Sequence, residues 1–287
     1  MNSPSNLKKL HLSSFSKINA FLYVTKKRKD GYHTLKTVFC PLYLSDTVIL
    51  SFQTNQISIS CDSSLVPVNS ENICWKAAEL FFKETHLPPA VSIQIIKRIP
   101  VAAGLGGGSS NAAAVLLGLN QFHQEPLSFR QIQKLALQLG ADVPFFLLNK
   151  PAYAQGIGEE LTVIPKIKPY WVLLVCPSYS VSTAEVYEKL TFSLTNVEKH
   201  PKNPSSEDIV FDMVKHLHND LESVTFKIHS TLSSQKEQLL QVGAVGSLMS
   251  GSGPTLFGLF ESEKKAISAI HSWVGNEQLI LTRLKLH

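Results

Sequence analysis

The chain has 287 residues, of which 44% are hydrophobic, and a formal net charge of +5. This length suffices for one large domain or two ordinary ones, but the longest apolar runs fall far short of the ~20 residues that a bilayer span requires. The modest charge is spread along the chain rather than concentrated in a basic stripe, so we expect small anionic substrates as partners, with no nucleic acid and no membrane.

The N-terminal part is rich in strand-forming residues. Ile18–Val24, Val38–Leu44 and Thr47–Phe52 are β-branched or aromatic runs separated by turn-prone residues, which predicts three strands. The charged segment 26–31 is expected to connect the first two as a hairpin, and its last two residues, Asp-Gly, supply a left-handed turn.

A strand, a glycine-rich loop and a helix follow in that order. Asn72–Glu84 has apolar residues at helical spacing, and Ala90–Ile99 returns to an extended pattern. After the glycine-rich loop, Asn111–Phe122 is predicted to be a helix rich in alanine and leucine. A further helix is predicted over Phe129–Leu139 and ends at Gly140.

A second cycle of strands and helices begins after Pro151. The polar stretch 195–207 is predicted to be an exposed excursion. The other expected elements are strands at Leu161–Ile164 and Tyr170–Cys176, helices at Ala184–Leu190, Val210–Leu217 and Ser234–Gln241, and an apolar hairpin at Leu248–Phe260. We therefore predict two α+β lobes joined near residues 155–160, with domains at 1–158 and 159–287.

The sequence also indicates the cellular compartment of the protein. A polar stretch follows Lys8 and Lys9, where a secretion signal would have its apolar core. The four cysteines are widely spaced, with no close pair for a metal and no dense disulfide framework. We expect a cytoplasmic protein with reduced, mostly buried thiols, and a monomer or a weak homodimer.

The segment Gly104–Ser110, Gly-Leu-Gly-Gly-Gly-Ser-Ser, indicates a phosphate-binding loop. A backbone that wraps closely around phosphate needs residues without side chains, and the N-terminus of the following helix adds free N–H groups and a positive dipole end. We expect Ser109 or Ser110 to cap this helix and to offer a hydroxyl to phosphate or to magnesium. A merely flexible turn is the alternative.

Spacing separates this segment from better-known glycine loops. A Walker A loop requires Lys and then Ser or Thr after its last glycine, and Ser-Ser-Asn stands here instead. A dinucleotide fingerprint requires glycine at position 109 or 111, which hold serine and asparagine. The HRD and DFG segments of protein kinases do not occur in the chain.

The segment from Pro100 to Ala113 resembles the second motif of the GHMP kinases. Within these, the chain is similar to the 4-diphosphocytidyl-2-C-methyl-D-erythritol kinases of the non-mevalonate isoprenoid route. That resemblance rests on Ser16–Leu22, Asp30–Leu35, Gly140–Phe146 and Ser250–Thr255, which are distributed over nearly the whole length of the chain. It implies a two-lobe α+β fold with an ATP-binding, ribosomal-protein-S5-like N-terminal domain and a substrate-binding, ferredoxin-like α/β-plait C-terminal domain.

The resemblance also implies the catalytic residues. Asp142 would be the base for the substrate hydroxyl, although its local sequence also allows a helix cap or a turn. Lys17 would stabilise developing negative charge, although a lysine in such a strand usually points to solvent. Asn19 lies on the same strand face and would help to position the substrate.

The cytosine of the substrate would be recognised by aromatic residues. Tyr32 would stack on the base, His33 would meet its hydrogen-bonding edge, and Tyr187 would close the other face. Tyr32 and His33 could equally be ordinary hairpin residues. Ser250–Thr255 could be a simple tight turn or a second glycine loop that helps to close the substrate site.

The nucleotide would be held by the glycine loop and the residues around it. The implied set is Pro100, Val101, Ala102, Ala103, Gly104, Leu105, Gly106, Gly107, Gly108, Ser109 and Ser110, together with Lys97 and Asn72, either of which could instead be a surface residue. Ala102 and Ala103 replace glycines that some members carry, which we expect to be harmless. We expect no protein carboxylate for magnesium, so that the ion rests on ATP oxygens and a serine hydroxyl.

The expected activity is transfer of a phosphoryl group from ATP, with magnesium, to the 2-hydroxyl of a cytidine diphosphate derivative of methylerythritol. Homoserine and mevalonate kinases share the glycine loop and provide the first alternative. The second is a nucleotide-binding regulator that retains the fold and lacks catalysis.

Overall fold

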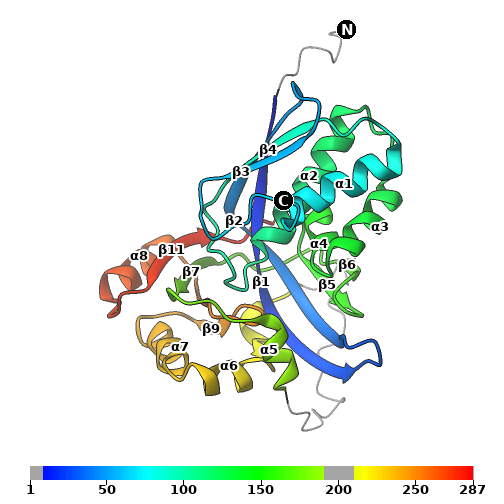
Figure 1. The fold of residues 1–287 in the computed structure, drawn as a ribbon. Helices are drawn as coiled ribbons and strands as arrows, with labels where there is room; N and C mark the ends of the chain where they lie inside the picture. The colour runs from blue at the N-terminus through cyan, green and yellow to red at the C-terminus, as the bar shows by residue number, and fades with distance from the viewer. Residues whose placement is uncertain (1–8, 191–209, 287) are drawn as a thin grey trace. The chain divides into compact units, whose positions relative to one another are not determined.

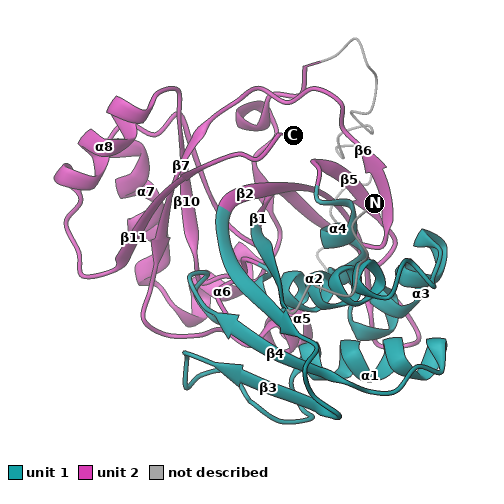
Figure 2. Cartoon of the chain, turned by 90° about the horizontal axis from the view of Figure 1, so that it is seen from above, with its two compact units in different colours: residues 1–16, 44–101, 106–149 teal, residues 17–43, 102–105, 150–287 magenta. Residues whose placement is uncertain are grey.

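The computed structural model describes residues 9–190 and 210–286. The predicted polar excursion at 195–207 lies outside these residues. The chain forms two compact units, coloured in Figure 2: unit 1 comprises residues 1–16, 44–101 and 106–149, and unit 2 comprises residues 17–43, 102–105 and 150–287. These units do not coincide with contiguous halves of the chain. The domain division at residue 158 stays a prediction.

Figure 1 shows two long strands, β1 (Lys9–Lys27) and β2 (His33–Ser51). Residues of each strand belong to both units. The sequence predicted two separate strands where β2 is continuous, and that prediction is wrong. Asp46, one of the turn-prone residues between the two predicted strands, is buried and accepts hydrogen bonds from two backbone N–H groups of a distant segment. The hairpin connection is confirmed, with Gly31 at a φ of 88° in the left-handed region.

Unit 1 combines a sheet with four helices. Strand β4 pairs antiparallel with β2 on one side and parallel with β3 on the other. Helix α1 packs on α2 and α3, and α4 also packs on both. The elements are β3 (Ile57–Cys61), β4 (Val91–Ile96), α1 (Ile73–Thr85), α2 (Gly107–Phe122), α3 (Phe129–Leu139) and α4 (Val143–Leu148).

Helix α2 begins earlier than predicted. Its N-cap is Gly106, at a φ of 72°, so Ser109 and Ser110 lie inside the first turn and do not cap the helix. The prediction of a serine cap is therefore wrong. Left-handed backbone is accessible to glycine at little cost, which allows the chain to turn into the helix without a capping side chain. The N-terminus of α2 thus presents backbone N–H groups from glycines.

Unit 2 contains a four-stranded antiparallel sheet in the order β11-β7-β10-β9. Its strands are β7 (Trp171–Cys176), β9 (Gly246–Met249), β10 (Leu256–Phe260) and β11 (Gln278–Arg283). Helix α7 (Thr231–Gln241) precedes β9, and α8 (Glu263–Ser272) connects β10 to β11. This β-α-β-β-α-β succession is that of a ferredoxin-like α/β plait.

The other elements of unit 2 extend around β1 and β2. Strand β5 pairs antiparallel with β2 and with β6, and β8 pairs parallel with β1. These elements are β5 (Ala152–Gln155), β6 (Glu160–Val163), β8 (His218–Asn219), α5 (Thr183–Glu188) and α6 (Glu222–Ile228). The hairpin predicted around 248–260 is confirmed by β9 and β10.

The helix predicted at Val210–Leu217 is wrong. The structure has a single 3-10 turn at Met213–Lys215, followed directly by β8. The side chain of Asp212 accepts hydrogen bonds from the backbone N of Val214 and from the hydroxyl of Tyr170, at 3.2 and 2.7 Å. The local bond to Val214 and the bond to the distant Tyr170 hydroxyl together favour a turn at Asp212 over a continuous helix.

The described part of the chain has no helix that is both long and apolar enough to cross a bilayer. Three of the four cysteines are buried and the fourth, Cys61, is partly buried. Burial raises the pKa of the Cys176 thiol to about 11. Thiols of this kind are poorly reactive.

His123 makes the stability of unit 1 depend on pH. Its ring is packed among Phe81, Phe82 and Phe122, and Nε2 is buried with no hydrogen-bond partner among the described residues. Burial lowers the pKa of His123 from its ordinary value of 6.5. The unfolded chain therefore binds a proton at His123 more readily than the folded protein does. The stability that the neutral, buried His123 ring contributes is present above pH 6.5 and is lost as pH falls toward the folded pKa.

We predict that His123→Phe makes the free energy of unfolding less dependent on pH below 6.5 than in the parent protein. Urea unfolding at a series of pH values measures this difference. His271→Phe, at an exposed position near the end of α8, is the control and should keep the parent pH dependence. Equal pH dependence in His123→Phe and the parent would contradict the role given to burial.

Candidate active site

Lys17 and Asn19 lie on the same face of β1 in unit 2. Lys17 is only 4% exposed, which differs from the usual solvent-facing lysine. Its Nζ donates a hydrogen bond of 2.8 Å to Oδ1 of Asn19 and lies 5.4 Å from the ring centroid of Phe39. The ammonium is therefore held at a defined position within the protein.

Thr37 on β2 sets the orientation of the Asn19 amide. The Thr37 hydroxyl donates to the carbonyl of Phe21, so its oxygen accepts from Nδ2 of Asn19 at 2.8 Å. This arrangement turns Oδ1 of Asn19 toward Lys17. Sequence reasoning missed Thr37, because it is linked to the site only by strand pairing.

The loop Ser250–Thr255 connects β9 to β10 and lies against Gly104 and Lys17. The Ser250 hydroxyl donates to the carbonyl of Gly104 at 2.9 Å. A Cβ added to Gly251 would lie 3.4 Å from Nζ of Lys17 and 3.3 Å from the carbonyl oxygen of Gly104. The loop is therefore more than a tight turn between strands, since it forms close contacts around the buried lysine.

Three side chains from unit 2 hold this loop in place. Nδ2 of Asn219 donates to the carbonyls of Met249 and Gly251, each at 2.8 Å. Oε1 of Glu222 accepts from the backbone N of Met249 at 2.9 Å, and the Thr225 hydroxyl donates to the carbonyl of Ser252 at 3.1 Å. No local pattern in the sequence indicated these residues, since each acts on a loop far along the chain.

Two of the three residues predicted to recognise cytosine are in contact with each other. His33 is buried at the start of β2, and its ring stacks on that of Tyr187 with centroids 5.1 Å apart. Burial, and then the charge of Lys27, lower the pKa of His33, which favours a neutral ring that can both donate and accept hydrogen bonds. The side chain of Tyr32 is 57% exposed. The recognition of cytosine by these residues stays a prediction.

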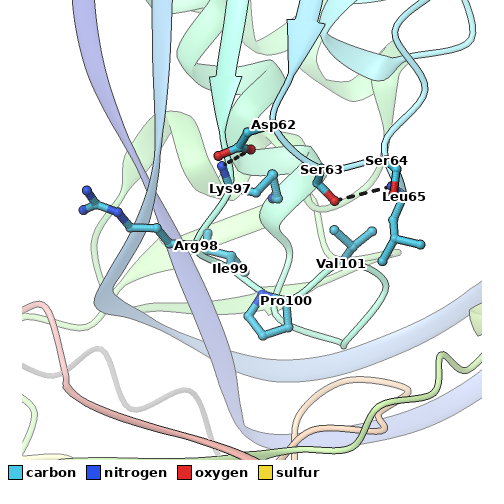
Figure 3. A pocket seen from close by; sticks show the side chains of 9 residues that line it. All are labelled: Asp62, Ser63, Ser64, Leu65, Lys97, Arg98, Ile99, Pro100 and Val101. Carbon is cyan, nitrogen blue, oxygen red and sulfur yellow. Dashed lines mark hydrogen bonds between the residues drawn. The ribbon is translucent and has the colours of Figure 1, made fainter.

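Unit 1 contains a cavity of about 440 Å³ beside the end of β4 (Figure 3). Its lining combines apolar side chains with hydroxyl and charged groups: Asp62, Ser63, Ser64, Leu65, Lys97, Arg98, Ile99, Pro100 and Val101. Oδ1 of Asp62 accepts a hydrogen bond of 2.9 Å from the backbone N of Lys97. The cavity is open to solvent, and its volume and mixed lining can accommodate a small ligand with polar groups.

The structure places the other predicted nucleotide residues of unit 1 as follows. The Lys97 ammonium forms an ion pair with the buried Asp46. Asn72 caps α1: its Oδ1 accepts from the N of Cys74, and its Nδ2 donates to a backbone carbonyl. Ser109 is half-buried, whereas Ser110 is buried. Of the two hydroxyls, that of Ser109 is the more accessible to a ligand.

Asp142 precedes α4, where the backbone N of Val143 bonds to the carbonyl of Gly140 at 3.1 Å. The residue is half-buried, and its carboxylate makes no capping hydrogen bond to the helix. A turn is therefore present, but the carboxylate does not serve as a helix cap. The role of base stays a prediction.

Ala102 has a φ of 52°, in the left-handed region that favours glycine. The replacement of glycine at this position is thus a source of backbone strain rather than a neutral change. We predict that Ala102→Gly raises the free energy of unfolding by about 0.5 kcal/mol. The relief of strain stabilises the folded protein, and the greater entropy of glycine in the unfolded chain offsets part of that gain. Urea unfolding measures this, and Ala103→Gly, which has no such strain, should lower stability. A loss in both variants would contradict the strain.

Comparison with known proteins identifies the family. The GHMP kinases N terminal domain matches residues 72–150, and the GHMP kinases C terminal domain matches residues 210–277. The chain is 44% identical to a 4-diphosphocytidyl-2-C-methyl-D-erythritol kinase of Syntrophus aciditrophicus, over 91% of this chain and 93% of the relative. A kinase of the same name from Geobacter metallireducens is 43% identical over 93% of this chain and 94% of its own length.

The chain belongs to the 4-diphosphocytidyl-2-C-methyl-D-erythritol kinase family. A crystal structure of 4-(cytidine 5'-diphospho)-2C-methyl-D-erythritol kinase superposes with a TM-score of 0.78 and 32% identity, covering 96% of this chain and 99% of that one. A homoserine kinase from Cytophaga hutchinsonii superposes with a TM-score of 0.67 at 14% identity, covering 100% of this chain and 97% of that one. This second likeness shows the fold alone.

Membership of the 4-diphosphocytidyl-2-C-methyl-D-erythritol kinase family confirms two of the predictions made from the sequence. The two-lobe GHMP kinase fold is confirmed, and so is a kinase as the class of enzyme. The homoserine and mevalonate alternatives share the fold but have much lower identity. The roles of the individual site residues stay predictions.

Proposed function

We propose that this kinase transfers the γ-phosphoryl group of ATP to the 2-hydroxyl of 4-diphosphocytidyl-2-C-methyl-D-erythritol, giving the 2-phosphate and ADP. The observation that carries the proposal is the buried Lys17 beside Ser250–Thr255, in a chain 44% identical to a relative of that name. A buried ammonium can stabilise negative charge that develops during phosphoryl transfer. The reaction is a step of the non-mevalonate isoprenoid route, and we infer a cytoplasmic location.

The nucleotide is assigned to unit 1. The cavity of about 440 Å³ takes the base, between apolar side chains such as Leu65 and Val101 and the polar groups of Asp62 and Lys97. The N-terminus of α2, with its glycine backbone, takes the phosphates.

Magnesium is assigned to the phosphate oxygens of ATP, with the hydroxyl of Ser109 as the protein ligand. Ser109 lies in the first turn of α2 and is only half-buried, so its hydroxyl is accessible to a ligand at the helix N-terminus. Magnesium commonly keeps several waters and binds through substrate phosphates. When bound, it would neutralise charge on the transferred group.

Two residues carry the chemistry in this proposal. Asp142 accepts the proton of the substrate hydroxyl, and Lys17 stabilises the resulting negative charge. Asn19 keeps Lys17 in place through their hydrogen bond of 2.8 Å. Tyr32, His33 and Tyr187 recognise cytosine by stacking and by hydrogen bonds to its edge.

The test is ADP release by the purified protein. With ATP and magnesium, we expect ADP to form on addition of 4-diphosphocytidyl-2-C-methyl-D-erythritol, and not on addition of homoserine or mevalonate. Phosphorus NMR of the product identifies which hydroxyl has been phosphorylated. ADP release with homoserine or mevalonate alone would overturn the proposed substrate while leaving the kinase class intact.

A further inference from the structure

Asp46 on β2 is a buried carboxylate that the proposed reaction does not use. Its side chain is 0% exposed. It pairs with the Lys97 ammonium and accepts hydrogen bonds of 2.8 Å from the backbone N of both Arg98 and Ile99. Because a buried charge is costly unless it is fully satisfied, this set of bonds fixes the three donors firmly. All three belong to residues that line the cavity of unit 1.

The same carboxylate reaches the start of α2. Nδ2 of Asn111 donates to Oδ2 of Asp46 at 3.0 Å and to the hydroxyl of Ser14 at 2.8 Å. Ser14 in turn donates to the hydroxyl of Ser110, also at 2.8 Å. One buried network therefore joins the lining of the cavity to the first turn of α2, all within unit 1.

The lining of the cavity and the first turn of α2 are in close contact. A Cβ added to Gly107, the first residue of α2, would lie 3.1 Å from Nζ of Lys97. The position of the Lys97 ammonium thus bears directly on the N-terminus of the helix. With its charge met by Asp46, Lys97 is a hydrogen-bond donor at a fixed place rather than a mobile cation.

We propose that Asp46 is a positioning residue for the nucleotide. It holds Lys97 and the end of β4 against the first turn of α2, so that the cavity for the base and the helix N-terminus for the phosphates keep a fixed spacing. Such preorganisation favours ligand binding because less ordering remains to be done when the ligand arrives. This inference rests on the proposed binding of ATP to unit 1.

Asp46→Asn tests the inference with little change in shape. The remaining oxygen can still accept from the backbone of Arg98 and Ile99, but the new amide nitrogen cannot accept from Lys97 or Asn111. We expect the Kd for a non-hydrolysable ATP analogue, measured by calorimetry, to rise about tenfold or more. The KM for ATP should rise equally, whereas kcat and the KM for the alcohol substrate should stay within about threefold of the parent values.

Asp212→Asn is a matched control. Asp212 also faces a lysine, Lys168 at 3.6 Å, and accepts hydrogen bonds from a side chain and from backbone, but it lies in unit 2 and does not line the cavity. We expect it to lower the melting temperature without changing the Kd for the ATP analogue.

Two outcomes would overturn the positioning role. One is an unchanged Kd for the ATP analogue in Asp46→Asn, and the other is an equal loss toward both substrates that follows a general loss of folded protein.

In the double variant with Lys97→Met, we expect losses of ATP affinity that are less than additive, because Asp46 acts through Lys97. Full additivity would count against this route. If the parent protein bound no ATP analogue, the proposed function itself would fail, and this inference with it.

Discussion

Asp142→Asn is expected to lower kcat at least ~100-fold while leaving the affinity for ATP nearly unchanged, because an amide cannot accept the proton of the substrate hydroxyl. The substitution also separates two interpretations of Asp142. Asparagine serves in a turn as well as aspartate does, so a residue that only shaped the turn before α4 would tolerate it. Steady-state ADP release gives kcat, and calorimetry with an ATP analogue gives the affinity.

A loss of catalysis in Asp142→Asn can be distinguished from a loss of fold. The carboxylate of Asp142 makes no capping hydrogen bond to α4, so the exchange of an oxygen for a nitrogen removes no cap. The melting temperature of the variant, compared with that of the parent protein, shows whether the fold is kept. Turnover at the parent rate would remove Asp142 from the role of base. A loss of turnover that accompanied a large fall in melting temperature would point to a structural role instead.

The elements that could be predicted from the sequence are those whose signals are local. Helix α3 begins and ends where its periodic apolar residues and its terminal glycine indicate, and α1 is displaced by one residue at each end. Strand β2 was wrongly divided because Asp46 is typical of a turn. Its place inside a strand depends on donors from Lys97 to Ile99, about fifty positions away in the chain, which no local pattern shows.

The candidate site shows the same limit. Lys17, Asn19 and the glycine-rich segments stand out because their residue types are unusual for their surroundings or match a motif. Thr37 and Asn219, which orient Asn19 and the Ser250–Thr255 loop, are ordinary polar residues in the sequence. Their importance arises only when strand pairing and loop packing bring distant segments together.

Gly104→Ala is expected to be the most damaging of the small substitutions in the glycine loop. The new Cβ would lie 2.1 Å from the carbonyl oxygen of Ser250 and 3.1 Å from that of Gly253, and backbone on both sides leaves little room to relax. The φ of 76° adds strain for any residue with a side chain. Together these effects should cost about 3 kcal/mol or more of the free energy of unfolding. Urea unfolding measures the loss.

Activity should fall further than stability alone requires, because the displaced loop is the one that contacts Lys17. Gly243→Ala measures the cost of the left-handed backbone alone. Gly243 has a φ of 100°, and no atom lies within 4 Å of an added Cβ. The substitution should therefore lower the free energy of unfolding by about 1–2 kcal/mol and leave kcat unchanged. The difference between the two variants then measures the close approach of Ser250–Thr255 to Gly104. Equal losses of stability would show that the loop can yield, and full activity in Gly104→Ala would show that its contact with Lys17 is not needed for phosphoryl transfer.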